Sequence, residues 1–226
     1  YKIKKIWTKF YPNSIGLFYS TITDFLGFEI NEGEFKVMSL SSFGKPIYEK
    51  ELKKIFDINN FKINMDYFEF HKNPSKSFSK KLYDLFGEPY LDISEEKNFN
   101  KYADIASSAQ LILEHTMKNL IKKASDLSGK RKIVLTGGVA LNCKMIHNLS
   151  KQGIFEELIV PPSPGDSGSA VGAANFAFLE KSKNKTLNFS NINLGPDKNL
   201  INKKENKDNF FLKVNLTNDY IINAAK

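Results

Sequence analysis

Two glycine-bearing turns carry the residues whose types and spacing could bind a ligand. The first is Thr136-Gly137-Gly138-Val139-Ala140-Leu141-Asn142, directly after an apolar run. Gly137 and Gly138 have no Cβ, so the backbone could come close to a ligand, and the predicted helix that follows offers free N–H groups to an anion. Asn142, one turn into that helix, could give its amide to a purine or ribose. A turn needed only for tight packing has the same sequence, and the stretch matches neither a P-loop nor the dinucleotide fingerprint.

The second turn spans residues 162–174 and has the sequence PSPGDSGSAVGAA. Asp166 stands between glycines at the start of a predicted helix. Its carboxylate could cap that helix by accepting backbone N–H groups, or it could be a metal ligand near phosphates. Both turns follow short apolar runs, and α/β domains bind ligands at the carboxyl ends of their strands. Two such turns on strands expected to be adjacent favour one shared nucleotide site.

A third stretch, residues 31–38, has the sequence NEGEFKVM. Lys36 could pair with a phosphate and Glu34 could accept from a ribose hydroxyl. The competing interpretation is an ordinary solvated helix start. The three histidines are isolated and lack metal-ligand spacing, and we predict no Ser-His-Asp set.

Helices and short strands are expected to position these stretches. From residue 132 onward the order strand, glycine turn, helix occurs twice, which is typical of an α/β domain, and both of these strands are expected to be buried. The predicted helices span 15–25, 31–40, 48–56, 79–86, 100–127, 140–151 and 168–181. The predicted strands span 1–10, 132–135 and 158–160, with a strand or hairpin at 61–70.

Composition limits the class of protein. The 226 residues are 41% hydrophobic, enough for a sizeable core, and no apolar run is long enough to span a membrane. The net charge is +8, but the lysines are scattered, so we expect a solvated surface and neither nucleic acid nor membrane as a partner. Anionic small-molecule substrates suit this charge. The single cysteine suits a reducing compartment, and we expect a cytoplasmic protein.

Taken together, the motifs resemble the O-carbamoyltransferase family of nodulation-factor and antibiotic biosynthesis. The resemblance implies an N-terminal domain of the actin-like ATPase (RNase H-like) superfold, similar to the universal tRNA threonylcarbamoyl transferase. This chain would contain mainly its second subdomain, as a partial domain over 1–183, followed by a linker or tail over 184–226. The matching segments occur in the family's order and are 13–20, 27–38, 42–46, 103–110, 136–142 and 161–174.

The resemblance also implies an activity. Carbamoyl phosphate and ATP would give carbamoyl adenylate, and the carbamoyl group would then pass to a hydroxyl of a small-molecule acceptor. Asp166 would be a ligand of a divalent metal of the iron type. Gly137, Gly138 and Asn142 would line the nucleotide pocket. Less directly, Gly33, Glu34 and Lys36 would approach the ribose or phosphate side.

The sequence also departs from the family pattern. The family's paired metal-binding histidines and the Glu- and Arg-rich motif of its C-terminal domain are absent, and Ser39 stands where the family usually has glycine. We therefore expect a fragment that is inactive by itself. Two alternatives stay open. One is another enzyme on the same superfold, threonylcarbamoyl-transferring or sugar-kinase-like, and the other is a non-catalytic nucleotide-binding module.

Overall fold

The computed structural model describes residues 3–73 and 76–181. The chain divides into two compact units, Tyr1–Ala177 and Phe178–Lys226. The predicted tail over 184–226 lies outside the described residues. Among the described residues, no helix combines the length and apolar character needed to cross a bilayer.

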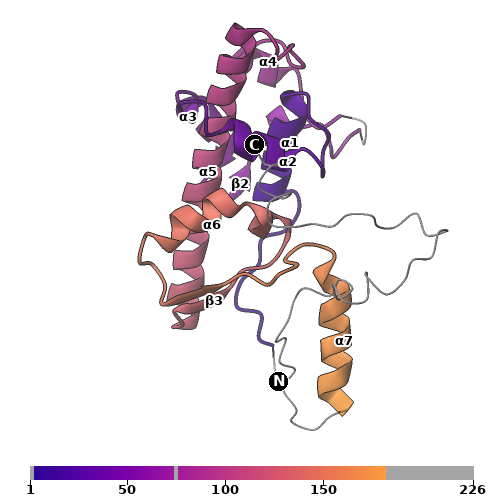
Figure 1. The fold of residues 1–226 in the computed structure, drawn as a ribbon, viewed down its shortest axis with the longest axis vertical. Helices are drawn as coiled ribbons and strands as arrows, with labels where there is room; N and C mark the ends of the chain where they lie inside the picture. The colour runs from indigo at the N-terminus through magenta and orange to yellow at the C-terminus, as the bar shows by residue number, and fades with distance from the viewer. Residues whose placement is uncertain (1–2, 74–75, 182–226) are drawn as a thin grey trace, which may run out of the picture. The chain divides into compact units, whose positions relative to one another are not determined.

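A long helix, α5 (Glu96–Ser128), is the central element of the first unit. Figure 1 shows the helices that lie against it, which are α1 (Ile15–Phe25), α2 (Glu34–Leu40), α3 (Glu49–Ile55) and α6 (Cys143–Ser150). The apolar spacing that predicted a helix over 100–127 is confirmed, because these side chains face the surrounding helices and are buried. The helix ends at Gly129, whose φ of 66° suits a glycine.

Helix α1 matches the predicted span of 15–25. Ser14 is its N-cap, and the Ser14 hydroxyl accepts a hydrogen bond from the Leu17 N–H at 3.3 Å. Phe18, Ile22 and Phe25 recur at helical spacing and are fully buried in the core. Local capping and apolar periodicity therefore suffice to explain this helix.

The loop between α2 and α3 crosses α5 at Gly44. A Cβ on Gly44 would lie 2.0 Å from the Ala103 carbonyl oxygen, so only glycine fits this crossing. Two hydrogen bonds fix the loop: the Lys45 N–H donates to Asp104 Oδ1 at 2.6 Å, and the Tyr48 N–H donates to Ser108 Oγ at 3.0 Å. The segments 42–46 and 103–110, which carry part of the family resemblance, therefore contact each other.

Residues 56–86 connect α3 to the segment before α5 and contain a small hairpin, a 3-10 helix and a short α-helix. Strand β1 (Phe56–Asp57) pairs antiparallel with β2 (Lys62–Ile63), and η1 (Met65–Tyr67) and α4 (Lys81–Phe86) follow. The predicted strand or hairpin at 61–70 is confirmed at β2 and at Phe68, which forms an isolated antiparallel bridge with Phe78, but the 3-10 helix η1 separates the two.

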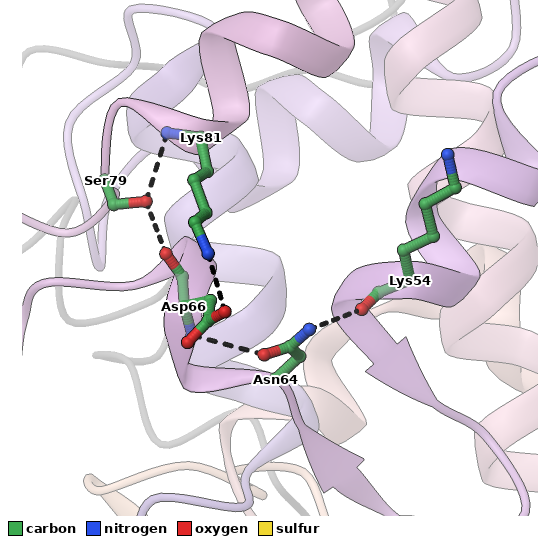
Figure 2. Close-up of polar contacts among 5 residues, drawn as sticks. All are labelled: Lys54, Asn64, Asp66, Ser79 and Lys81. Atoms are coloured by element: carbon green, nitrogen blue, oxygen red, sulfur yellow. Dashed lines mark hydrogen bonds and ion pairs between the residues drawn. The ribbon is translucent and has the colours of Figure 1, made fainter.

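Hydrogen bonds and one ion pair hold the loops of residues 56–86 together (Figure 2). The Asn64 amide donates to the Lys54 carbonyl oxygen at 3.2 Å and accepts from the Asp66 N–H at 3.3 Å. The Asp66 carboxylate pairs with Lys81 at 2.6 Å, and the Asp66 carbonyl oxygen accepts from the Ser79 hydroxyl at 2.6 Å. The Lys81 ammonium lowers the pKa of the Asp66 carboxyl. These contacts link η1 to the ends of α3 and α4.

Strands β3 (Lys132–Val134) and β4 (Glu157–Ile159) pair in parallel, and α6 lies between them in the chain. This confirms the predicted strand–helix–strand order, and α7 (Gly168–Lys181) matches its predicted span. The prediction that both strands are buried is wrong, since Val134 is 64% and Ile159 47% exposed. The reason is that the described residues cover only one face of this two-stranded sheet.

The prediction of a strand at 1–10 is also wrong for residues 3–10, the part of this segment that the structure describes. Residues 3–10 form no strand, and their side chains are exposed. The segment is held instead through Trp7, whose ring lies edge-on to Phe61 at 5.5 Å and under the Lys123 ammonium at 5.0 Å. Aromatic and cation–π contacts therefore replace the expected ladder of backbone hydrogen bonds.

Candidate functional site

The two glycine turns lie together at the carboxyl ends of β3 and β4. The strand pairing continues beyond β3, because the Leu135 N–H donates to the Ile159 carbonyl oxygen at 2.9 Å. The Gly137 N–H then donates to the Pro164 carbonyl oxygen at 2.7 Å, which joins the first turn to the second. The prediction that the two turns follow adjacent strands is confirmed.

The backbone of the first turn is accessible at Gly137 and Gly138. Gly137 has a φ of 100°, a conformation that favours glycine, and a 3-10 helix, η2 (Gly138–Leu141), follows it. A Cβ added at Gly137 or Gly138 would meet no atom of the described residues within 4 Å. Internal packing therefore does not explain the second glycine, and the space in front of both residues is available to a ligand.

Asn142 is the N-cap of α6 and not, as predicted, a residue one turn inside that helix. Its Oδ1 accepts from the Met145 N–H at 2.9 Å. Its amide also pairs reciprocally with the amide of Gln110 on α5: Gln110 Nε2 donates to Asn142 Oδ1 at 3.0 Å, and Asn142 Nδ2 donates to Gln110 Oε1 at 2.9 Å. The side chain proposed for ligand binding is thus rigidly held beside the first turn.

Further polar groups extend this pair into a partly buried network. The Tyr19 hydroxyl donates to Gln110 Oε1 at 3.0 Å, and Gln110 Nε2 donates to Glu114 Oε1 at 2.8 Å. Asn148 Nδ2 donates to Glu114 Oε2 at 2.9 Å. Burial raises the pKa of Tyr19, and the Glu114 and Glu34 carboxylates raise it further against the lowering effect of the Asn142 amide. Tyr19 therefore stays a protonated donor at neutral pH.

Sequence reasoning missed this network. Gln110 belongs to a motif that carried the family resemblance, but no role was predicted for it. The available signal was the spacing, since Gln110 and Glu114 are four residues apart and lie on one face of a helix. The contacts with Tyr19 and Asn142 join residues far apart in the chain, so spacing could not reveal them.

Gly33 has a packing role. A Cβ there would lie 2.6 Å from Phe28 Cβ and 2.7 Å from the Glu29 carbonyl oxygen, both too close. Its neighbour Glu34 accepts from the Ser20 hydroxyl at 2.6 Å and from the Asn31 N–H at 3.1 Å, which ties α2 to α1.

Lys36 is exposed, and its ammonium lies 5.8 Å from the centre of the Phe28 ring. In the described ranges, no hydrogen bond or ion pair joins Glu34 or Lys36 to either glycine turn. Their predicted contacts with a ribose or phosphate stay predictions.

Lys144 connects α6 to the end of α2. Its ammonium donates to Ser41 Oγ at 2.8 Å and lies 3.2 Å from Ser42 Oγ. Burial lowers the pKa of Lys144, while the Glu114 carboxylate opposes that shift. The helix that Asn142 caps is therefore fixed on α2 as well as on α5.

Asp166 lies in the second turn with an exposed side chain, for which the described residues provide no hydrogen-bond partner. Within 3–73 and 76–181, no group of three or more His, Cys, Asp or Glu side chains could hold a metal ion. A hollow of about 560 Å³ lies elsewhere, between α3, β1 and α5, and Lys53, His115 and Lys118 are among its lining residues. It includes none of the predicted site residues, so the candidate site is the open face of the two turns.

The family model described as "Carbamoyltransferase N-terminus" matches residues 1–175. The chain belongs to this carbamoyltransferase family. The match includes both glycine turns, α1 and α5, so the network around Gln110 lies wholly within the family region.

Relatives agree with this assignment. The chain is 36% identical over 172 residues to "Uncharacterized protein sll1178" of Synechocystis, covering 74% of this chain and 28% of that protein. It is 28% identical over 177 residues to "Nodulation protein NolNO" of Sinorhizobium fredii, covering 76% of this chain and 24% of that protein. It is 33% identical over 102 residues to "Nodulation protein U" of Rhizobium tropici, covering 45% of this chain and 18% of that protein. The chain thus spans about a quarter of the length of the first two relatives.

Proposed function

We propose that this chain forms the nucleotide-binding part of a carbamoyltransferase. The enzyme would transfer a carbamoyl group from carbamoyl phosphate, through a carbamoyl adenylate made from ATP, to a hydroxyl of a small-molecule acceptor. We also propose that β3, β4 and their helices belong to the second subdomain of an actin-like ATPase fold. The observation that carries the proposal is the junction of two glycine turns at the carboxyl ends of adjacent parallel strands.

The geometry of the first turn suits a nucleotide. Gly137 and Gly138 leave open the space that a side chain would fill, so a ligand can approach the backbone. Asn142 lies beside this turn, where hydrogen bonds with Gln110 hold its amide in place. The net charge of +8 attracts phosphates. When bound, ATP would supply the adenylyl group of the carbamoyl adenylate, with pyrophosphate as the leaving group, and the residues of this chain would bind and orient it.

The described residues suit an iron-type metal less well than they suit a nucleotide. Asp166 offers one carboxylate, and no second or third ligand accompanies it within the described ranges. One exposed carboxylate does not hold a divalent cation tightly. We therefore assign no step of the reaction to a metal.

Substitution of Gly138 by alanine tests the nucleotide site. Within residues 3–73 and 76–181 the added methyl meets no atom closer than 4 Å, and the φ of Gly138 is not positive, so the fold is expected to tolerate it. The same methyl enters the space proposed for the ligand. We expect isothermal calorimetry with ATP to show binding to the wild-type chain and at least about tenfold weaker binding to Gly138→Ala, since a close backbone contact is lost.

Gly172→Ala is the matched control. Gly172 lies in α7, and a Cβ there also meets nothing within 4 Å in the part of the chain that the structure describes. We expect this variant to bind ATP as the wild type does. Absence of binding heat in the wild type, or equal affinity of Gly138→Ala and the wild type, would contradict the proposal.

A further inference from the structure

The hollow of about 560 Å³ between α3, β1 and α5 contains none of the residues of the two glycine turns. Its volume lies within the range of small-molecule sites, about 300–1,000 Å³. Lys53, His115, Lys118 and Asn119 contribute polar side chains to its lining, which includes one acidic residue, Asp57. The nucleotide site proposed above does not account for this basic hollow, so it is a candidate for a separate binding site.

The Asp57 carboxylate is engaged by its own turn. It accepts from the backbone N–H groups of Asn59 and Asn60, both at 3.0 Å, and from Asn60 Nδ2 at 2.7 Å. The hydrogen bond from the Asn60 side chain is the largest of the effects that lower the pKa of Asp57. Among the described residues, Asp57 forms no ion pair with either lysine of the hollow.

Lys118, on α5, carries a charge that no acidic side chain pairs with. Within residues 3–73 and 76–181, its ammonium has no ion-pair or hydrogen-bond partner. Glu114, four residues earlier, is its neighbour on the helix surface. The Glu114 carboxylate instead accepts from Gln110 Nε2 at 2.8 Å and from Asn148 Nδ2 at 2.9 Å. The Lys118 ammonium is therefore available to an anion in the hollow.

Lys53 reaches the same hollow from α3. Its ammonium pairs with the Glu49 carboxylate at 2.6 Å, and both side chains are accessible to solvent, so this ion pair is weak. An ammonium group has three N–H donors, so Lys53 can bond to a ligand while it keeps Glu49. Two helices thus supply one ammonium group each to a single hollow.

A smaller hollow, of about 300 Å³, continues along α5 toward the end of that helix. Asn59 and Asn119 line both hollows, and Asn119 Nδ2 donates to Asn59 Oδ1 at 3.2 Å. Lys122 and Lys123 line the smaller hollow, where Asp126 is the acidic residue. Lysines outnumber acidic residues in the lining of each hollow, so the potential over both favours anions.

We propose that the hollow between α3, β1 and α5 binds a small molecule that carries a phosphate group. A phosphate group brings a charge of about −1.5 to −2 and several acceptor oxygens, which suit ammonium groups from two helices. Lys53 and Lys118 would each donate to these oxygens, and His115 can add a ring N–H. This site does not rest on the proposed function, because no residue of the glycine turns takes part in it.

Titration of the 226-residue chain with inorganic phosphate and, separately, with glycerol 3-phosphate tests the site. We expect saturable shifts of the backbone amide NMR signals of Asn59, Lys118 and Asn119. The probe that binds more tightly shows whether the ligand is free phosphate or a phosphate ester. Absence of saturable shifts at these residues with both probes, or shifts confined to Gly137 and Gly138, would overturn the proposal.

Lys118→Gln tests the charge that the site requires. The Lys118 ammonium has no partner among the described residues, so we expect the variant to keep its fold. We expect it to bind the tighter probe at least about tenfold more weakly, because one charge-assisted hydrogen bond is lost.

Lys97→Gln is the matched control, since it removes the same charge from the same helix. Lys97 pairs with Glu95 at 3.3 Å and lines neither hollow. We expect its affinity for the probe to equal that of the wild type. Wild-type affinity in Lys118→Gln would overturn the proposal. Equal weakening by both substitutions would overturn it too, because attraction by the net charge would then explain the binding.

Discussion

Replacing Gly44 by alanine should strongly destabilise the chain. The new Cβ would lie 2.0 Å from the Ala103 carbonyl oxygen and 2.4 Å from the Asp104 backbone nitrogen, so the obstacle is helix backbone and not a movable side chain. The loop must retreat by about 1.4 Å to reach an ordinary contact of 3.4 Å. That shift would break the bonds from Lys45 N–H to Asp104 and from Tyr48 N–H to Ser108.

Overpacking costs roughly 1–3 kcal/mol and each lost hydrogen bond about 1 kcal/mol, so we expect the free energy of unfolding to fall by roughly 3–5 kcal/mol. Urea denaturation followed by far-ultraviolet circular dichroism measures this change. Gly138→Ala is the control, because its Cβ has open space, and it should change stability by less than about 1 kcal/mol. A loss below about 1 kcal/mol for Gly44→Ala would refute the crossing described for α5.

Three further substitutions test other contacts by denaturation. Burial and the Asp24 carboxylate raise the pKa of Tyr90 from 10.0 to about 12, so stability should be full below about pH 10 and fall as pH rises from about 10 to 12. Tyr90→Phe should lessen that fall, and an equal pH dependence in both proteins would exclude this cause. Tyr19→Phe should lower the free energy of unfolding by about 1 kcal/mol, because Gln110 Oε1 loses the hydrogen bond from the Tyr19 hydroxyl. An unchanged urea midpoint would argue against that bond. Gly33→Ala should lower the free energy of unfolding by roughly 1–3 kcal/mol, because the new Cβ would lie 2.6 Å from the Phe28 Cβ. An unchanged free energy of unfolding would show that α2 can shift to make room.

Much of the local structure follows from the sequence alone. The span 15–25 agrees with α1, because apolar spacing and the Ser14 cap act over a few residues, and the span 168–181 agrees with α7. The order of strand, turn and helix from residue 132 onward, and with it the junction of the two glycine turns, also follows from local patterns. The family was recognised from the motifs, and the match over residues 1–175 confirms it.

Tertiary structure decided what individual residues do. The pair of Gln110 and Asn142 joins positions 32 residues apart, and Lys45 and Asp104 are 59 apart, so no local pattern could reveal either contact. Gly33 and Gly138 look alike in the sequence, yet a Cβ at Gly33 would collide with its surroundings, whereas at Gly138 it meets open space. The physical reason is that a glycine's role depends on which atoms the fold brings within a few ångströms of its Cα, and these come from distant parts of the chain.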